Sequence, residues 1–150
     1  MSEMLGNQYF LTRRFEAAKP VYENLIGTSF YSDKIAKKLI VCYSVTHDTN
    51  RAFQLFYNLI QKDPRIISNT KFYEEDCPCP EIVPKIISEE IVYENADEKY
   101  LVLGMLSLYC NVSDSLKYFN KLKNSSVIDK EKLNNTIAVI NKIKLNLKTN

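Results

Sequence analysis

Apolar side chains recur along this chain every three or four residues, which is the spacing of helices with one buried face. In the segment that begins at Phe15, for example, Ala18, Tyr22 and Leu25 fall at positions i, i+4 and i+7. Only three glycines and five prolines interrupt the 150 residues. The pattern predicts an all-α chain with helices over residues 2–11, 15–25, 34–45, 51–61, 82–94, 100–109, 115–123 and 129–147, and leaves open a short helix over 66–73.

The first half of the chain repeats itself, because residues 5–30 match residues 39–64 at an offset of 34. A period of about this length is typical of helical hairpins that stack, since one hairpin cannot bury its apolar face alone. The matching pairs are Leu5 and Leu39, Tyr9 and Tyr43, Ala18 and Ala52, Tyr22 and Phe56, and Leu25 and Leu59.

These residues resemble the tetratricopeptide repeat family. In that family a small residue lies in the middle of the first helix and an aromatic one follows three positions on. An alanine lies early in the second helix, with an aromatic four positions later and a proline at the end of the repeat. The first unit has Gly6, Tyr9, Ala18 and Tyr22; the second has Ile40, Tyr43, Ala52, Phe56 and Pro64; and a degenerate third, spaced about one residue short, has Gly104, Ser115 and Phe119.

The resemblance implies one domain, residues 1–150, built of antiparallel helical hairpins stacked in a right-handed superhelix. The implied parts are repeat 1 over about residues 1–31, repeat 2 over about 32–66, a diverged insert over about 67–99, a degenerate repeat over about 100–126 and a C-terminal capping helix over about 129–148. A cap is expected because an open end of such an array would expose apolar surface.

The resemblance also implies a function, which is a non-catalytic protein-binding scaffold. A protein or peptide partner would lie in a groove lined by the first helix of each hairpin. The groove residues on this interpretation are Asn7, Phe10, Lys34, Lys37, Val41 and Ser44. Lys34 and Lys37 would favour an acidic group on the partner, or else they belong to a solvated helix edge.

Charge is distributed unevenly along the second half. Residues 73–99 hold nine acidic residues and two lysines, and residues 115–150 hold eight lysines and two acidic residues. These segments are either solvated faces or patches that attract a partner or a second copy. A self-assembling structural subunit, including a homodimer with Leu133, Ile140 and Leu147 as a heptad seam, is therefore the alternative function. The sequence pI near 8.3 is too low to favour a nucleic-acid partner.

Cys77-Pro78-Cys79 is the local motif with chemical potential, and a thiol or metal protein that uses Cys77 and Cys79 is a less favoured alternative. No second cysteine pair lies at zinc-site spacing, and Cys42 and Cys110 fall on helix faces interpreted as core. We therefore expect no metal, no cofactor and a proline-stiffened connector. One histidine, His47, and the absence of phosphate-loop or catalytic motifs indicate that the protein is not an enzyme.

The first residues have an acid where a secretory leader has basic residues, and no apolar run reaches the roughly 20 residues of a membrane helix. We therefore expect a cytoplasmic protein without membrane contact, whose four cysteines are thiols.

Overall fold

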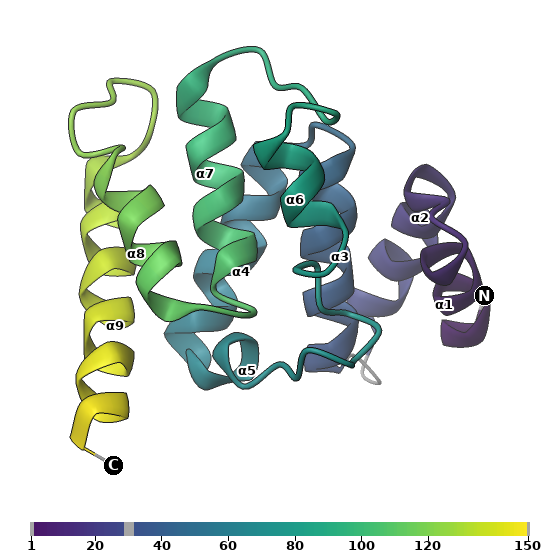
Figure 1. The fold of residues 1–150 in the computed structure, drawn as a ribbon. Coiled ribbons are helices and arrows are strands. Elements are labelled where there is room, and N and C mark those ends of the chain that lie inside the picture. The colour runs from purple at the N-terminus through teal and green to yellow at the C-terminus, as the bar shows by residue number, and fades with distance from the viewer. Residues whose placement is uncertain (1, 29–31, 150) are drawn as a thin grey trace. The chain divides into compact units, whose positions relative to one another are not determined.

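Figure 1 shows the computed structural model of the chain, which describes residues 2–28 and 32–149. In this part of the chain the structure has nine helices and no strands, so the all-α prediction is confirmed. None of these helices has both the length and the apolar character that crossing a bilayer requires. The helices are α1 (Glu3–Leu11), α2 (Phe15–Ile26), α3 (Asp33–Val45), α4 (Thr49–Lys62), α5 (Arg65–Ser68), α6 (Ile82–Ile87), α7 (Ala96–Ser107), α8 (Val112–Asn120) and α9 (Lys130–Thr149).

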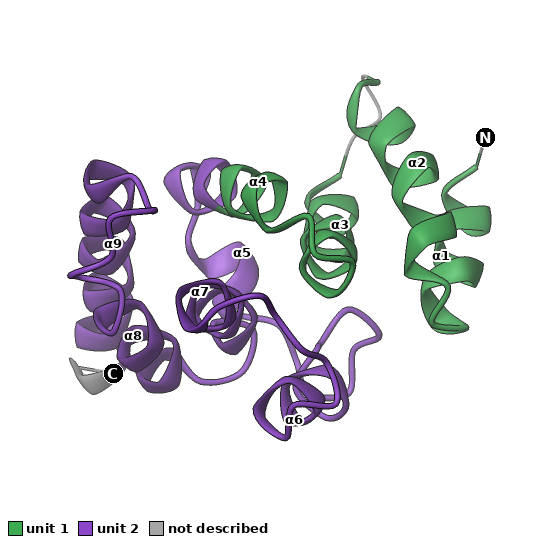
Figure 2. Ribbon diagram, turned by 90° about the horizontal axis from the view of Figure 1, so that it is seen from above, with its two compact units in different colours: residues 1–56 green, residues 57–150 purple. Residues whose placement is uncertain are grey.

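The chain divides into two compact units, and the boundary between them lies inside α4 (Figure 2). Unit 1 is residues 1–56 and unit 2 is residues 57–150. In unit 1, α2 packs against both α1 and α3. In unit 2, α8 packs against both α7 and α9, and α6 packs against α7.

Side-chain caps decide where several helices begin. Ser2, Ser32, Asn95 and Asn111 each accept a hydrogen bond from the backbone N–H three residues later. Such a cap satisfies one of the N–H groups that a helix start leaves without an intrahelical partner. The carboxylate of Asp129 does the same for α9, where it accepts from the N–H groups of residues 131 and 132.

Several predicted boundaries in unit 2 are wrong. The predicted helix over 82–94 ends at Ile87, because Glu89 has a φ of 65°, which a right-handed helix does not contain. Helix α7 begins at Ala96 rather than at residue 100, since Asn95 caps it. Helix α8 begins at Val112 rather than at residue 115, because Asn111 caps it.

The turns that join α1 to α2 and α3 to α4 have the same backbone structure, 34 residues apart. Arg13 and His47 have φ values of 64° and 65°, in the left-handed region. In each turn the next residue donates its N–H to a tyrosine carbonyl at 2.8 Å, Arg14 to Tyr9 and Asp48 to Tyr43. The sequence match is therefore also a match in local structure.

The two alanines that anchor the sequence match lie in equivalent surroundings. Ala18 donates its N–H to the carbonyl of Arg14, and Ala52 donates to that of Asp48, both at 3.0 Å. Both side chains are completely buried. The two alanines therefore share the same backbone hydrogen bond and the same burial.

Unit 2 contains a third helical pair, α7 and α8, which includes Gly104, Ser115 and Phe119 of the predicted degenerate repeat. Ser115 is buried and its hydroxyl donates to the carbonyl of Gly104 at 2.6 Å. Phe119, four residues later, is also completely buried. The connection to α8 runs through N–H groups that bond three residues back, Tyr109 to Leu106 and Cys110 to Ser107. This tighter turn explains why Gly104 and Ser115 are one residue closer in sequence than Gly6 and Ala18.

Candidate functional site

The six residues of the predicted peptide groove are mostly in the interior of the structure. Lys34 is exposed and Asn7 is partly exposed. The four others, Phe10, Lys37, Val41 and Ser44, are buried, and even the Lys37 side chain is only 5% exposed. Of the set, Lys34 and Asn7 therefore present most of the exposed surface.

Asn7 has a role in packing within unit 1. Its side-chain oxygen accepts hydrogen bonds from the Tyr22 hydroxyl at 2.7 Å and from the Lys38 ammonium at 2.9 Å. Because these donors belong to α2 and α3, one amide joins three helices. The Phe10 ring meets the Phe15 ring edge-on at 5.5 Å between centroids. Peptide binding by the predicted set stays a prediction.

Unit 2 contains a cleft of about 770 Å³ that the sequence did not reveal. It lies among the end of α4, α5, the start of α8 and the last turns of α9. This volume lies within the range of protein pockets that take small ligands or parts of a peptide. Its lining residues, to which we refer as the cleft, are Ile60, Gln61, Pro64, Arg65, Ser68, Asn69, Val112, Val139, Lys142, Ile143, Asn146 and Leu147.

The cleft combines apolar surface with positive charge. Val139, Ile143 and Leu147 follow one another at intervals of four along α9, so they share one helix face. Leu147 is 62% exposed, which leaves apolar area for a partner. Arg65 and Lys142 supply the charges, and none of the described lining residues is acidic. Arg65 is partly neutralised by Asp63, which lies 3.4 Å from its Nε.

The predicted heptad seam on α9 is wrong. Leu133 and Ile140 are completely buried, whereas Leu147 is exposed at the cleft. Leu133 and Ile140 lie on the buried face of α9, and α9 packs against α8. These residues are therefore not available to pair with a second copy of the chain.

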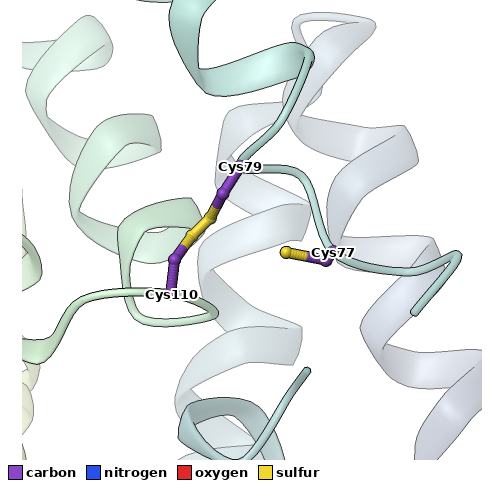
Figure 3. Close-up of side chains that lie close together, drawn as sticks. All are labelled: Cys77, Cys79 and Cys110. Carbon is purple, nitrogen blue, oxygen red and sulfur yellow. A yellow bond between two sulfur atoms is a disulfide. The ribbon is translucent and has the colours of Figure 1, made fainter. Parts of the chain in front are cut away.

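A second group of functional interest is the cysteine cluster, which consists of Cys77, Cys79 and Cys110 (Figure 3). Cys79 and Cys110 form a disulfide, and their Cα atoms are 6.3 Å apart, within the usual range for such a bond. The expectation of four thiols is therefore wrong for this pair. Cys110 is exposed, so its assignment to the core is wrong as well.

The backbone of the connecting loop positions Cys77 beside this disulfide. The N–H of Cys77 donates to the carbonyl of Glu74 at 3.1 Å, and the N–H of Val83 donates to that of Pro78 at 2.9 Å. Together these bonds hold the loop that carries Cys77 and Cys79. All three sulfur atoms lie within 4.8 Å of one another. Sequence spacing could not reveal this, because Cys110 is 31 residues from Cys79.

Cys42, in unit 1, has different surroundings. It is completely buried in α3, as predicted. Burial raises the pKa of its thiol to about 12, because a thiolate would lose its hydration there. A protonated thiol is a poor nucleophile and a poor metal ligand, so Cys42 is expected to be chemically inert.

We compared the chain with protein-family models, with curated proteins and with solved structures, and found no match in any of the three.

Proposed function

We propose that this protein is a non-catalytic helical-repeat scaffold that binds an acidic, partly apolar peptide segment of a protein partner. The observation that carries the proposal is the repeated hairpin of unit 1. The left-handed residues Arg13 and His47 and the buried Ala18 and Ala52 recur at the same 34-residue interval. Stacked hairpins of this kind present extended surfaces that are suited to holding other proteins.

The resemblance to the tetratricopeptide family supports the same proposal. We propose that the hairpins stack in a right-handed superhelix of that type and that the protein acts in the cytoplasm. Helix α9 would be its C-terminal cap. The packing of α9 against α8 supports a capping role, because it buries Leu133, Ile137 and Ile140.

The cleft is the binding site that the described surfaces favour. Its apolar side chains on α9 would take the leucine-like residues of a peptide, and Lys142 would attract a carboxylate at its edge. Without an acidic residue in its described lining, the cleft has no group that repels such a ligand. This chemistry agrees with the acidic partner expected from the sequence.

A fluorescent peptide with alternating leucine and glutamate residues tests the proposal by anisotropy, with a leucine–lysine peptide as the opposite-charge control. We expect Lys142→Glu to raise the Kd for the acidic peptide by about tenfold, since it places a like charge beside the ligand. Lys144→Glu is the matched control, because it makes the same charge change on α9 outside the cleft lining.

The outcomes distinguish the cleft from the groove predicted in unit 1. An unchanged Kd in Lys142→Glu, with a large loss in Lys34→Glu, would move the site to the groove predicted in unit 1. Equal binding of both peptides, or of neither, would overturn the proposal of an acidic peptide partner. Circular dichroism would confirm that each variant remains helical.

A further inference from the structure

Three sulfur atoms converge in unit 2, apart from the residues that line the cleft (Figure 3). Cys77 and Cys79 come from the loop that precedes α6, and Cys110 follows the end of α7. Two segments that are distant in sequence thus bring the same soft ligand atom to one point. Thiolate sulfur is the ligand that selects zinc and monovalent copper among the common metal ions.

We propose that the reduced protein binds one thiophilic d10 cation, Zn²⁺ or Cu⁺, through the sulfur atoms of Cys77, Cys79 and Cys110. Three thiolates complete a trigonal Cu⁺ site, or fill three of the four positions that Zn²⁺ prefers. With metal–sulfur bonds of about 2.3 Å, sulfur atoms in such a site lie about 3.8 Å apart. All three sulfur atoms already lie within 4.8 Å of one another, so small side-chain movements are sufficient once reduction lets the bonded Cys79 and Cys110 sulfur atoms separate.

The electrostatic surroundings favour a cation at this point. The carbonyl oxygen of Leu106, in the last turn of α7, lies 4.0 Å from the Cys79 sulfur and 3.8 Å from the Cys110 sulfur. The C-terminal end of a helix carries partial negative charge, which stabilises positive ions. The same end disfavours three neighbouring thiolates that no cation neutralises.

The protein backbone holds the ligands before any ion arrives. Pro78 and Pro80 restrict the loop because their rings fix φ, and the bond from the Val83 N–H to the Pro78 carbonyl closes it. Cys110 is held at the end of α7 by its N–H, which donates to the carbonyl of Ser107 at 3.0 Å. Because Cys110 is exposed, an ion can enter and leave from solvent.

The Cys79–Cys110 disulfide is the oxidised form of the same centre. A dithiol reductant gives two electrons to this bond: the S–S bond breaks, two protons pass to Cys79 and Cys110, and the reductant becomes a disulfide. The cation then displaces the protons of the three thiols as it binds. In the oxidised form only one thiol sulfur remains in the cluster, so the ion should bind only after reduction.

Metal titration of the full chain tests the proposal. The reduced protein is titrated anaerobically with Zn²⁺ against a chromophoric chelator, and separately with Cu⁺ against a copper(I) chelator. We expect one equivalent of at least one ion, and a loss of affinity of about 100-fold or more in Cys77→Ser, Cys79→Ser and Cys110→Ser. Cys42→Ser is the matched control and should bind like the unaltered protein.

A measurement on the unaltered protein makes the test independent of variant folding. Co²⁺ added to the reduced protein should give thiolate-to-metal charge-transfer absorption with the intensity of three sulfur ligands, and the oxidised protein should not give it. Binding of Zn²⁺ alone or of Cu⁺ alone would support the proposal and identify the ion. Absence of stoichiometric binding of both ions, or full affinity in Cys110→Ser, would overturn it.

Discussion

Single glycines determine how closely paired helices approach in each unit. A Cβ atom at Gly6 would lie 2.7 Å from Tyr22 Cε1, and one at Gly104 would lie 3.0 Å from the ring of Phe119. Both rings are completely buried, and the Tyr22 ring is also held by its hydrogen bond to Asn7. The neighbouring ring therefore has little freedom to move away from an added methyl group.

We expect Gly6→Ala to lower the free energy of unfolding by about 1 to 2 kcal/mol. An overpacked core costs about 1 to 3 kcal/mol, and the better helix propensity of alanine returns up to about 1 kcal/mol of it. Gly27→Ala is the matched control: its φ is −79°, and its nearest contact to an added Cβ is 3.6 Å. Urea unfolding measures both variants. A stability of Gly6→Ala equal to that of Gly27→Ala would refute the close contact.

The buried thiol of Cys42 makes stability depend on pH in a defined direction. Its native pKa is raised to about 12, whereas an unfolded cysteine titrates near about 8.5. Above that lower value the unfolded state binds fewer protons, so the Cys42 contribution to stability is complete below about pH 8.5 and decreases as pH rises. We expect this decrease to approach at most about 1.4 kcal/mol per pH unit.

Urea unfolding of the unaltered protein and of Cys42→Ala between about pH 8 and 10 isolates this contribution. The alanine variant should be less stable overall because it leaves a small cavity, but its stability should decrease less steeply with pH. Identical pH slopes in the two proteins would show that the Cys42 thiolate is tolerated in the folded state.

At the scale of helices and turns, the connections of unit 1 are built on a conformation that glycine adopts most easily. Arg13 and His47 adopt the left-handed conformation, which costs a residue with a Cβ atom about 1 to 2 kcal/mol. The Arg13 guanidinium lies 6.0 Å from the centre of the Phe15 ring. His47 is exposed, and it is the position that we choose to test.

We expect His47→Gly to raise the free energy of unfolding by up to about 1 kcal/mol, since it removes the Cβ penalty and returns some entropy to the unfolded chain. His47→Val should lower it by about 1 kcal/mol or more, because a β-branched residue is strained at positive φ. Thermal and urea unfolding should show that His47→Gly is the most stable, the unaltered protein intermediate and His47→Val the least stable. The reverse order would show that the turn does not hold this conformation.

The predicted starts of α3 and α9 agree with the structure within one residue, and Ser32 and Asp129 cap these helices. The predicted start of α8 at residue 115 is three residues late, because Asn111 is its cap. The end of α6 depends on the left-handed conformation of Glu89, which no local residue preference indicates. The 34-residue match between the first two helical hairpins could be read from the sequence because its signal is local periodicity.

The two candidate sites depend on contacts between distant segments. Cys110 joins the cysteine cluster only because the fold brings the end of α7 to the loop before α6. The cleft likewise requires α9 beside α4 and α5, although the interval of four between Val139, Ile143 and Leu147 was a visible signal. Spacing along a sequence cannot report such proximity, so neither site was predicted in full.

At the scale of the whole molecule, the disulfide and the matched turns at Arg13 and His47 lie in different units. The disulfide closes a loop of 31 residues entirely within unit 2, while unit 1 contains the helices α1 to α3 and the buried Cys42. Closing a loop of this length stabilises a fold by about 3 to 4 kcal/mol, because it restricts the unfolded chain. The stabilisation should therefore act first on the elements of unit 2.

We expect reduction of the disulfide to lower the hydrogen-exchange protection of α7, α8 and α9 by up to about 100-fold, with little change in α1, α2 and α3. Peptide-level exchange measured by mass spectrometry, with and without a phosphine reductant, gives the two units separately. Zn²⁺ or Cu⁺ added to the reduced protein should restore protection in unit 2, because an ion held by Cys77, Cys79 and Cys110 joins the same two segments. An equal loss in both units would instead mean that the chain opens as one cooperative structure, in which the disulfide stabilises α1 as much as α9.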